Sequence, residues 1–173
     1  MRAQHFYLLT ALSTSLKYSL TRRELFLAGL GDRTQDDLKT LDDLIRMNIL
    51  VEDARGRIRT RHRVIADKLL QSIADRKSVL CDAFRGLVYS LSVDLRPGEE
   101  YWRLRRVLRS LMNHDYLMRM LDVDGARSIY SSVEQQLHWD YHYWLQRGSL
   151  EVEEGDIRQA EQFLEQAFAL NST

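Results

Sequence analysis

Arg61, His62 and Arg63 place an imidazole between two guanidinium groups, where a basic β-hairpin is expected to end and a helix to begin. Guanidinium groups bind phosphate oxygens in a planar fork, and a histidine at such a joint can reach the same anion. The residue types therefore predict a phosphate contact here. The alternative interpretation is a helix-start histidine whose ring is satisfied by backbone groups.

Motifs for catalysis or for cradling a nucleotide do not occur in the sequence. It has no Gly-x-x-x-x-Gly-Lys-Ser/Thr loop, no Gly-x-Ser-x-Gly elbow and no paired-cysteine motif. We therefore predict that the chain by itself is not an enzyme and holds no cofactor of its own. Its single cysteine, Cys81, excludes an internal disulfide and is typical of a reducing compartment.

Two histidines have a spacing that can bind metal. His138 and His142 lie four residues apart and would share a helix face, and His114 with Asp115 would add ligands only if the fold brought them near. The alternative is an aromatic packing face, since aromatic side chains surround the pair: Trp139, Tyr141, Tyr143 and Trp144. The packing interpretation is favoured, and no metal site is predicted.

Three helices are expected before the hairpin. Apolar residues recur at helical spacing over residues 6–20. Thr21 and Glu24 form a capping-box pattern that starts a second helix, which Gly29 ends. A third helix begins at Thr34. The apolar pattern therefore predicts a helical start to the chain.

A change of period then predicts two strands, at residues 49–51 and 57–62, joined by turn residues. Three helices followed by a β-hairpin match a winged-helix module. A long helical pattern with a break near Lys77 follows. The predicted first domain is residues 1–92, a winged-helix-like domain with a long C-terminal helix.

The second predicted domain, residues 93–173, is helical, with Pro97 and Gly98 marking the boundary. Its expected helices are at about 99–113, 124–137, 139–153 and 156–170. The fold class is therefore mainly α, with a winged-helix module followed by an antiparallel helical array.

The end of the chain resembles a tetratricopeptide repeat, a helix-turn-helix unit of about 34 residues. Five residues match the offsets of that repeat: Trp144, Gly148, Gly155, Ala160 and Ala167. Glu151 departs from it, because an aromatic residue is usual at that position. The resemblance implies a surface for protein partners, and the alternative is an ordinary helical hairpin that carries small residues.

Charge and hydropathy limit the partners. Lys and Arg number 25, as do Asp and Glu, so net charge gives no general attraction to nucleic acid or anionic membrane. No apolar run is long enough to span a bilayer and no leader sequence is visible, so we expect a cytoplasmic protein without membrane contact.

The arginines of the hairpin, including Arg57 and Arg59, could contact DNA phosphates as the wing of a DNA-binding module. The helix that would enter the major groove carries four acidic residues: Asp36, Asp37, Asp42 and Asp43. These carboxylates would meet the phosphate backbone unfavourably. Nucleic acid is therefore the less favoured partner.

The order of three helices, a hairpin and then the Arg61-His62-Arg63 joint resembles the winged-helix region of signal-transduction ATPases, the STAND class with its NACHT and NB-ARC members. A Met-His-Asp motif stands at this joint in that family. The resemblance implies that His62 contacts the β-phosphate of ADP. Arg61 replaces the methionine and Arg63 replaces the aspartate, so the regulatory role of that aspartate is not carried over.

The resemblance implies a regulatory and sensor segment of a larger ATPase. Its partners would be the P-loop domain of the same parent protein, which would hold ADP or ATP, and a protein trigger bound by the helical repeats. The alternatives are a winged-helix DNA-binding regulator with a helical partner-binding domain, and a non-enzymatic adaptor.

Overall fold

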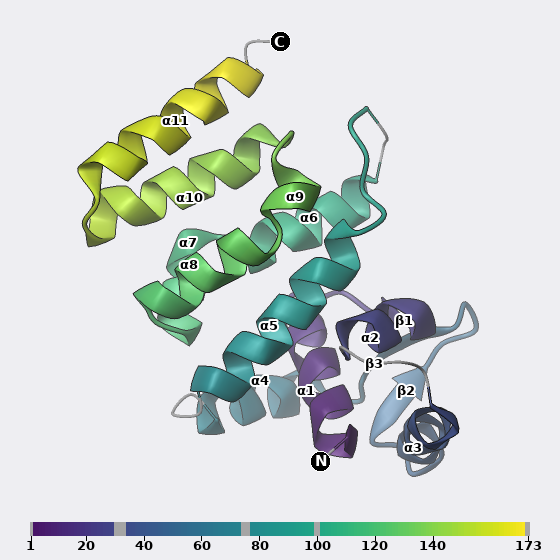
Figure 1. The fold of residues 1–173 in the computed structure, drawn as a ribbon. Helices are drawn as coiled ribbons and strands as arrows, with labels where there is room; N and C mark the ends of the chain where they lie inside the picture. The colour runs from purple at the N-terminus through teal and green to yellow at the C-terminus, as the bar shows by residue number, and fades with distance from the viewer. Residues whose placement is uncertain (1, 30–33, 74–76, 99–100, 172–173) are drawn as a thin grey trace. The chain divides into compact units, whose positions relative to one another are not determined.

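The computed structural model describes residues 2–29, 34–73, 77–98 and 101–171. Within these residues the chain forms eleven α-helices and three short β-strands (Figure 1), as expected for a mainly α protein. The chain divides into two compact units, Met1–Ser90 and Leu91–Thr173. Each unit has its own buried apolar residues and is described by itself.

Helix α1 (Arg2–Ser15) is a core helix of the first unit, since Phe6, Leu9 and Leu12 are almost fully buried. The predicted continuation of this helix to residue 20 is wrong. Lys17 takes a left-handed conformation with φ 60, which an α-helix does not accommodate. Leu20 instead lies in strand β1 (Leu20–Thr21) and is fully buried there. Its apolar character therefore reflects burial in the sheet, although its spacing from the preceding apolar residues is helical.

Helices α2 (Arg22–Ala28) and α3 (Gln35–Arg46) begin at the two predicted threonines. The hydroxyl of the threonine that precedes each helix accepts a hydrogen bond from the backbone N–H of the third helical residue. The carboxylate of that third residue in turn accepts a hydrogen bond from the backbone N–H of the threonine. These reciprocal bonds satisfy two amides that a helix start leaves unpaired. Gly29 is the C-cap of α2, as predicted.

Strands β2 (Leu50–Glu52) and β3 (Arg57–Thr60) form the predicted hairpin. The carboxylate of Asp53 accepts the N–H groups of Arg55 and Arg57 and so holds the turn. Both neighbours of β3 are antiparallel to it, in the order β1-β3-β2. Strand β1 was not predicted, because two residues are too few to show a period of two.

The predicted break in the long helical pattern is confirmed by helices α4 (Arg63–Ser72) and α5 (Lys77–Ser92). Helix α1 packs against α4, α3 and β3. Helix α5 approaches the end of α2 closely at Gly86, where a Cβ atom would lie 2.1 Å from the carbonyl oxygen of Ala28. Only a residue without a side chain fits at this point.

The second unit consists of short helices and a final long pair (Figure 1). They are α6 (Trp102–Leu111), α7 (His114–Met120), α8 (Val123–Ser132), α9 (Glu134–Leu137), α10 (Tyr141–Glu154) and α11 (Ile157–Asn171). Helix α7 was missed by the sequence analysis, and the predicted helix 124–137 is divided at Val133. The predicted helix start at residue 99 lies outside the described residues.

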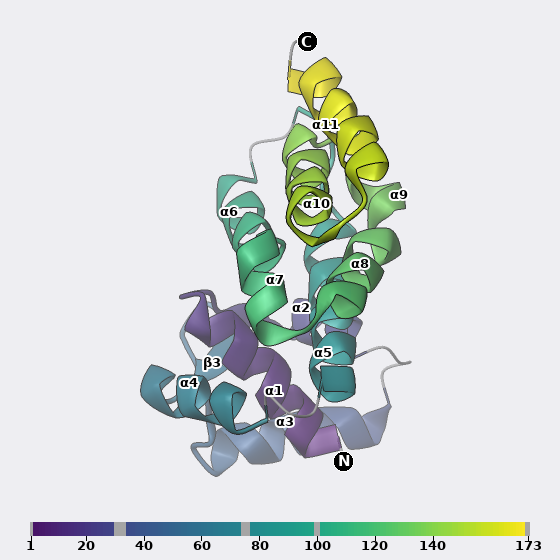
Figure 2. The ribbon, with the colours of Figure 1, turned by 90° about the vertical axis from the view of Figure 1, so that its left-hand side faces the viewer.

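Helices α10 and α11 lie side by side as a hairpin (Figures 1 and 2). A Cβ atom on Gly148 would lie 2.8 Å from two carbons of the Leu164 side chain, so the glycine lets the helices approach. Ala160 is buried in the same way, and the rings of Trp144 and Phe163 are 5.6 Å apart. The close approach at Gly148 and the ring contact both belong to the packing of α10 on α11.

Glu151 is 2% exposed, although glutamate is rarely buried. Its two carboxylate oxygens accept the Nε and Nη2 groups of Arg127, from α8, at 2.8 and 2.6 Å. The two parallel bonds satisfy the buried charge and join α8 to α10. In the described part of the chain, no helix is both long enough and apolar enough to cross a membrane.

Candidate functional site

The joint predicted to contact phosphate lies on the surface of the first unit. His62 is the N-cap residue of α4, in extended conformation, and its ring makes no capping hydrogen bond. Arg61, His62 and Arg63 are all exposed. The Nε atom of Arg63 is 3.8 Å from the Asp67 carboxylate, and both side chains are about half exposed, so solvent weakens this pair.

The start of α4 favours an anion. No acidic residue lies in its first turn, and the first N–H groups of any helix have no partner within the helix. The helix dipole adds partial positive charge at that end. Next to it, Val64 and Ile65 are 67% and 52% exposed. The joint therefore combines positive charge with an uncovered apolar pair.

Helix α3, which would face DNA in a winged-helix regulator, carries exposed carboxylates, one of which binds Arg22. Arg22 binds Glu52 of β2 through Nε and Nη2, at 2.9 and 2.8 Å, and Asp42 of α3 through Nη1 at 2.7 Å. The hydrogen bonds from Arg22 lower the pKa of Glu52. Asp36 and Asp42 remain exposed on α3. The helix that would face DNA thus presents carboxylates.

The two histidines with metal-binding spacing lie in different environments. His138 is exposed, and its Nδ1 atom is 3.0 Å from the carbonyl oxygen of Gln135. His142 is half-buried; burial lowers its pKa, and the charge of Arg109 acts in the same direction. Among the described residues, neither belongs to a group of three metal-binding side chains.

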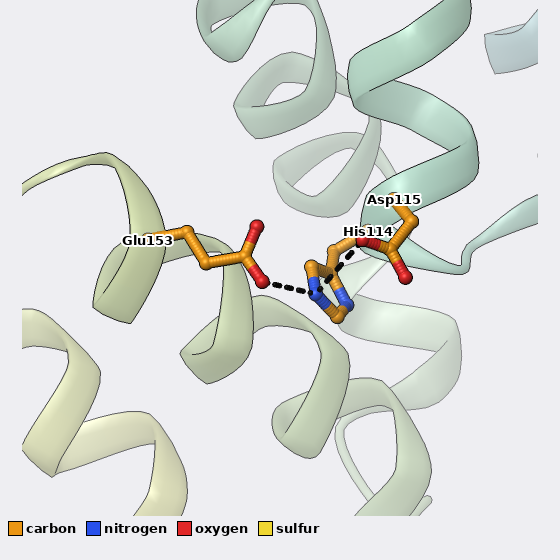
Figure 3. Close-up of side chains that lie close together, drawn as sticks. All are labelled: His114, Asp115 and Glu153. Atoms are coloured by element: carbon orange, nitrogen blue, oxygen red, sulfur yellow. Dashed lines mark hydrogen bonds and ion pairs between the residues drawn. The ribbon is translucent and has the colours of Figure 1, made fainter.

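The third histidine considered from the sequence does gather ligands (Figure 3). His114 and Asp115 begin α7, and Glu153 lies near the end of α10. The Nε2 atom of His114 is 3.1 Å from a Glu153 oxygen and 3.7 Å from an Asp115 oxygen. One ligand atom from each residue lies within 4.8 Å of the others. The histidine side chain is 13% exposed, so the protein holds its ring.

Gln146 fixes the protonation of this ring. Its amide oxygen accepts the backbone N–H of His114 at 2.9 Å and lies 2.9 Å from Nδ1 of the same residue. A backbone N–H only donates, so the amide atom facing it is the oxygen. That oxygen only accepts, and Nδ1 therefore carries a hydrogen. Nε2 is left to face both carboxylates.

The charge around His114 is negative. Burial favours the neutral ring, but the hydrogen bonds with Gln146 and Glu153 and the charges of Asp115 and Glu153 outweigh it and raise the pKa of His114. An open hollow of about 390 Å³ is bordered by Asp115 and by Asn113, Met118 and Arg119. The cluster thus has one edge that solutes can reach.

Sequence reasoning missed Glu153 and Gln146. The two residues are seven apart and so share one face of α10, which is a signal that the sequence does carry. Their meeting with His114 depends on the packing of α7 against α10, which local spacing does not predict.

Comparison of the chain with models of known protein families, with curated proteins and with solved structures finds no match.

Proposed function

We propose that this chain is a regulatory and sensor segment of a STAND-class ATPase. In this proposal the first unit docks on a P-loop domain of the same parent protein and contacts the phosphate of its nucleotide. The element order supports it: α1, β1, α2 and α3 precede a hairpin, and β1 adds to the hairpin as a third strand. This order supports the winged-helix interpretation.

The observation that carries the proposal is the exposed start of α4. His62 has no capping bond, two arginines flank it, and the helix dipole favours an anion beside it. Val64 and Ile65 supply exposed apolar surface at the same place. The positive charge could contact the phosphate of a nucleotide bound by the P-loop domain, and the apolar pair could pack against the surface of that domain.

The second unit would receive the signal. Its final hairpin supports the tetratricopeptide-like interpretation, because Gly148 lies where α10 and α11 approach closely and Ala160 on α11 is buried. The departure at Glu151 has a physical reason, since Arg127 binds the carboxylate that replaces the usual aromatic ring. A partner would bind to this unit and alter how the first unit docks.

A DNA-binding regulator is the weaker alternative. Arg59 is exposed on β3 as a wing contact requires, but Asp36 and Asp42 on α3 would face the DNA backbone. Non-specific DNA affinity depends on positive charge that neutralises phosphates, and two carboxylates at the groove would reduce that affinity.

The retention of ADP tests the proposal. The natural polypeptide that contains this chain would be purified as His62→Ala and as His138→Ala, a control that removes an exposed histidine of the other unit. We expect faster loss of bound ADP from His62→Ala and unchanged loss from the control. Equal ADP loss from both variants, or a natural polypeptide that retains no ADP, would overturn the proposal.

A further inference from the structure

The cluster of His114, Asp115 and Glu153 belongs to the second unit and has no part in the nucleotide contact. We propose that these three side chains bind one divalent transition-metal ion, zinc being the best match, which joins α7 to α10. An imidazole nitrogen with carboxylate oxygens is a ligand set that zinc accepts. Calcium and magnesium prefer oxygen ligands throughout.

The spacing of the ligand atoms fits a single ion. Zinc bonds of about 2.1 Å in a tetrahedron place neighbouring ligand atoms about 3.4 Å apart. The distances from His114 Nε2 to the Glu153 and Asp115 oxygens, 3.1 and 3.7 Å, lie on either side of that value. Both carboxylates are more than half exposed and have room to close on an ion.

The tautomer of His114 directs its free nitrogen at the ion. Gln146 accepts the hydrogen of Nδ1, so Nε2 is the ring nitrogen available to an ion, and it faces both carboxylates. A cation placed among Nε2 and the two carboxylates would be attracted by all three groups. Metal-bound histidines are held in this way, by a carbonyl-type oxygen on the other nitrogen. Gln146 is therefore a positioning residue.

Charge complementarity also favours a divalent cation. The cluster brings two carboxylates beside one imidazole nitrogen. Among the described residues His114 is the only ion-pair partner of Asp115 and Glu153. A divalent ion would balance the charge of the two carboxylates.

Three protein ligands leave a fourth position free. Asp115 also borders the hollow beside the cluster, so a water molecule or a partner's side chain has access to the ion from there. The ion would hold the start of α7 against the end of α10. Its binding would stabilise the folded second unit, because the ligands do not meet in the unfolded chain.

Zinc titration of residues 1–173 tests the site. Chelator-treated protein would be titrated with zinc alone by calorimetry, and with cobalt, whose visible absorption reports a tetrahedral site. The matched pair is Glu153→Gln and Glu154→Gln, neighbouring exposed carboxylates of which only the first lies in the cluster. A double variant, His138→Gln with His142→Gln, removes the other histidine pair.

We expect one zinc per chain and a thermal midpoint that rises with zinc. The Kd should increase at least about tenfold in Glu153→Gln, which loses a direct ligand, and stay unchanged in the other two variants. Glu153→Gln keeps the side-chain shape, and circular dichroism would verify its fold. The proposal is overturned if zinc does not bind at a ratio of one, if Glu153→Gln binds it equally well, or if the double histidine variant loses it.

Discussion

Replacement of Gly86 by alanine should destabilise the first unit. The new Cβ atom would lie 2.1 Å from the carbonyl oxygen of Ala28, 3.0 Å from its carbonyl carbon and 3.4 Å from its Cα. All three are backbone atoms, so no change of rotamer relieves the clash, and α5 has to move away from α2. Overpacking of this kind costs about 3 kcal/mol, at the upper end of its usual range.

The helix preference of alanine offsets part of that cost. Alanine is favoured over glycine inside a helix by about 1 kcal/mol. The net loss in free energy of unfolding is therefore about 2 kcal/mol. Gly29→Ala is the matched control, because Gly29 has φ −71 and a Cβ atom there would meet its nearest neighbour at 3.4 Å, an ordinary contact.

The effect would be measured by hydrogen exchange of the amides in α2 and α5. Tryptophan fluorescence does not report on the first unit, because all three tryptophans lie in the second unit: Trp102, Trp139 and Trp144. A loss of about 2 kcal/mol corresponds to roughly 30-fold faster exchange of amides that open only on unfolding. The control should exchange at the parent rate or more slowly. A Gly86→Ala protein as protected as the parent would refute the close packing of α5 on α2.

Two further predictions concern ion pairs. Glu151→Ala leaves Arg127 without its buried partner and should lower the free energy of unfolding of the second unit by about 2 kcal/mol. This loss is smaller than for a fully buried pair, because the Arg127 side chain is 41% exposed. Urea unfolding followed by tryptophan fluorescence would measure the loss, and an unchanged midpoint would contradict the prediction. The pKa of Glu52 is lowered by its hydrogen bonds from Arg22, so its stabilisation is present above the ordinary glutamate pKa of about 4.3 and is lost as pH falls through the lower folded value. The difference in free energy of unfolding between the parent and Arg22→Gln, measured by urea unfolding, should therefore shrink as the pH is lowered from about 6 to about 3. A difference that stays constant over this range would rule out the linkage.

Local chemistry made part of the fold predictable. The capping box at Thr21 is predictable because it needs only residues three apart, and the helix start predicted at Thr34 has the same bonds in the structure. Strand β1 was not recognised, since Leu20 keeps the helical spacing of the residues before it and is buried by pairing with Ile58, far along the chain. Contacts between distant segments decide such cases, and spacing does not reveal them.

The candidate sites divide in the same way. Arg61, His62 and Arg63 are consecutive, so the sequence alone placed them together, and the structure adds their exposure and the uncapped helix start. His114 and Glu153 are brought together only by the packing of α7 on α10. The sequence indicated His114 and Asp115 as possible ligands but gave no reason to pair them with Glu153.

Hydrogen exchange at the start of α4, residues 61–66, tests the docking of the first unit most directly. It would be measured in the natural polypeptide that contains this chain, once loaded with ADP and once free of nucleotide. The account predicts slower exchange with ADP, because the nucleotide-bearing domain would cover His62 and the exposed pair Val64 and Ile65. Equal exchange in the two states would contradict it.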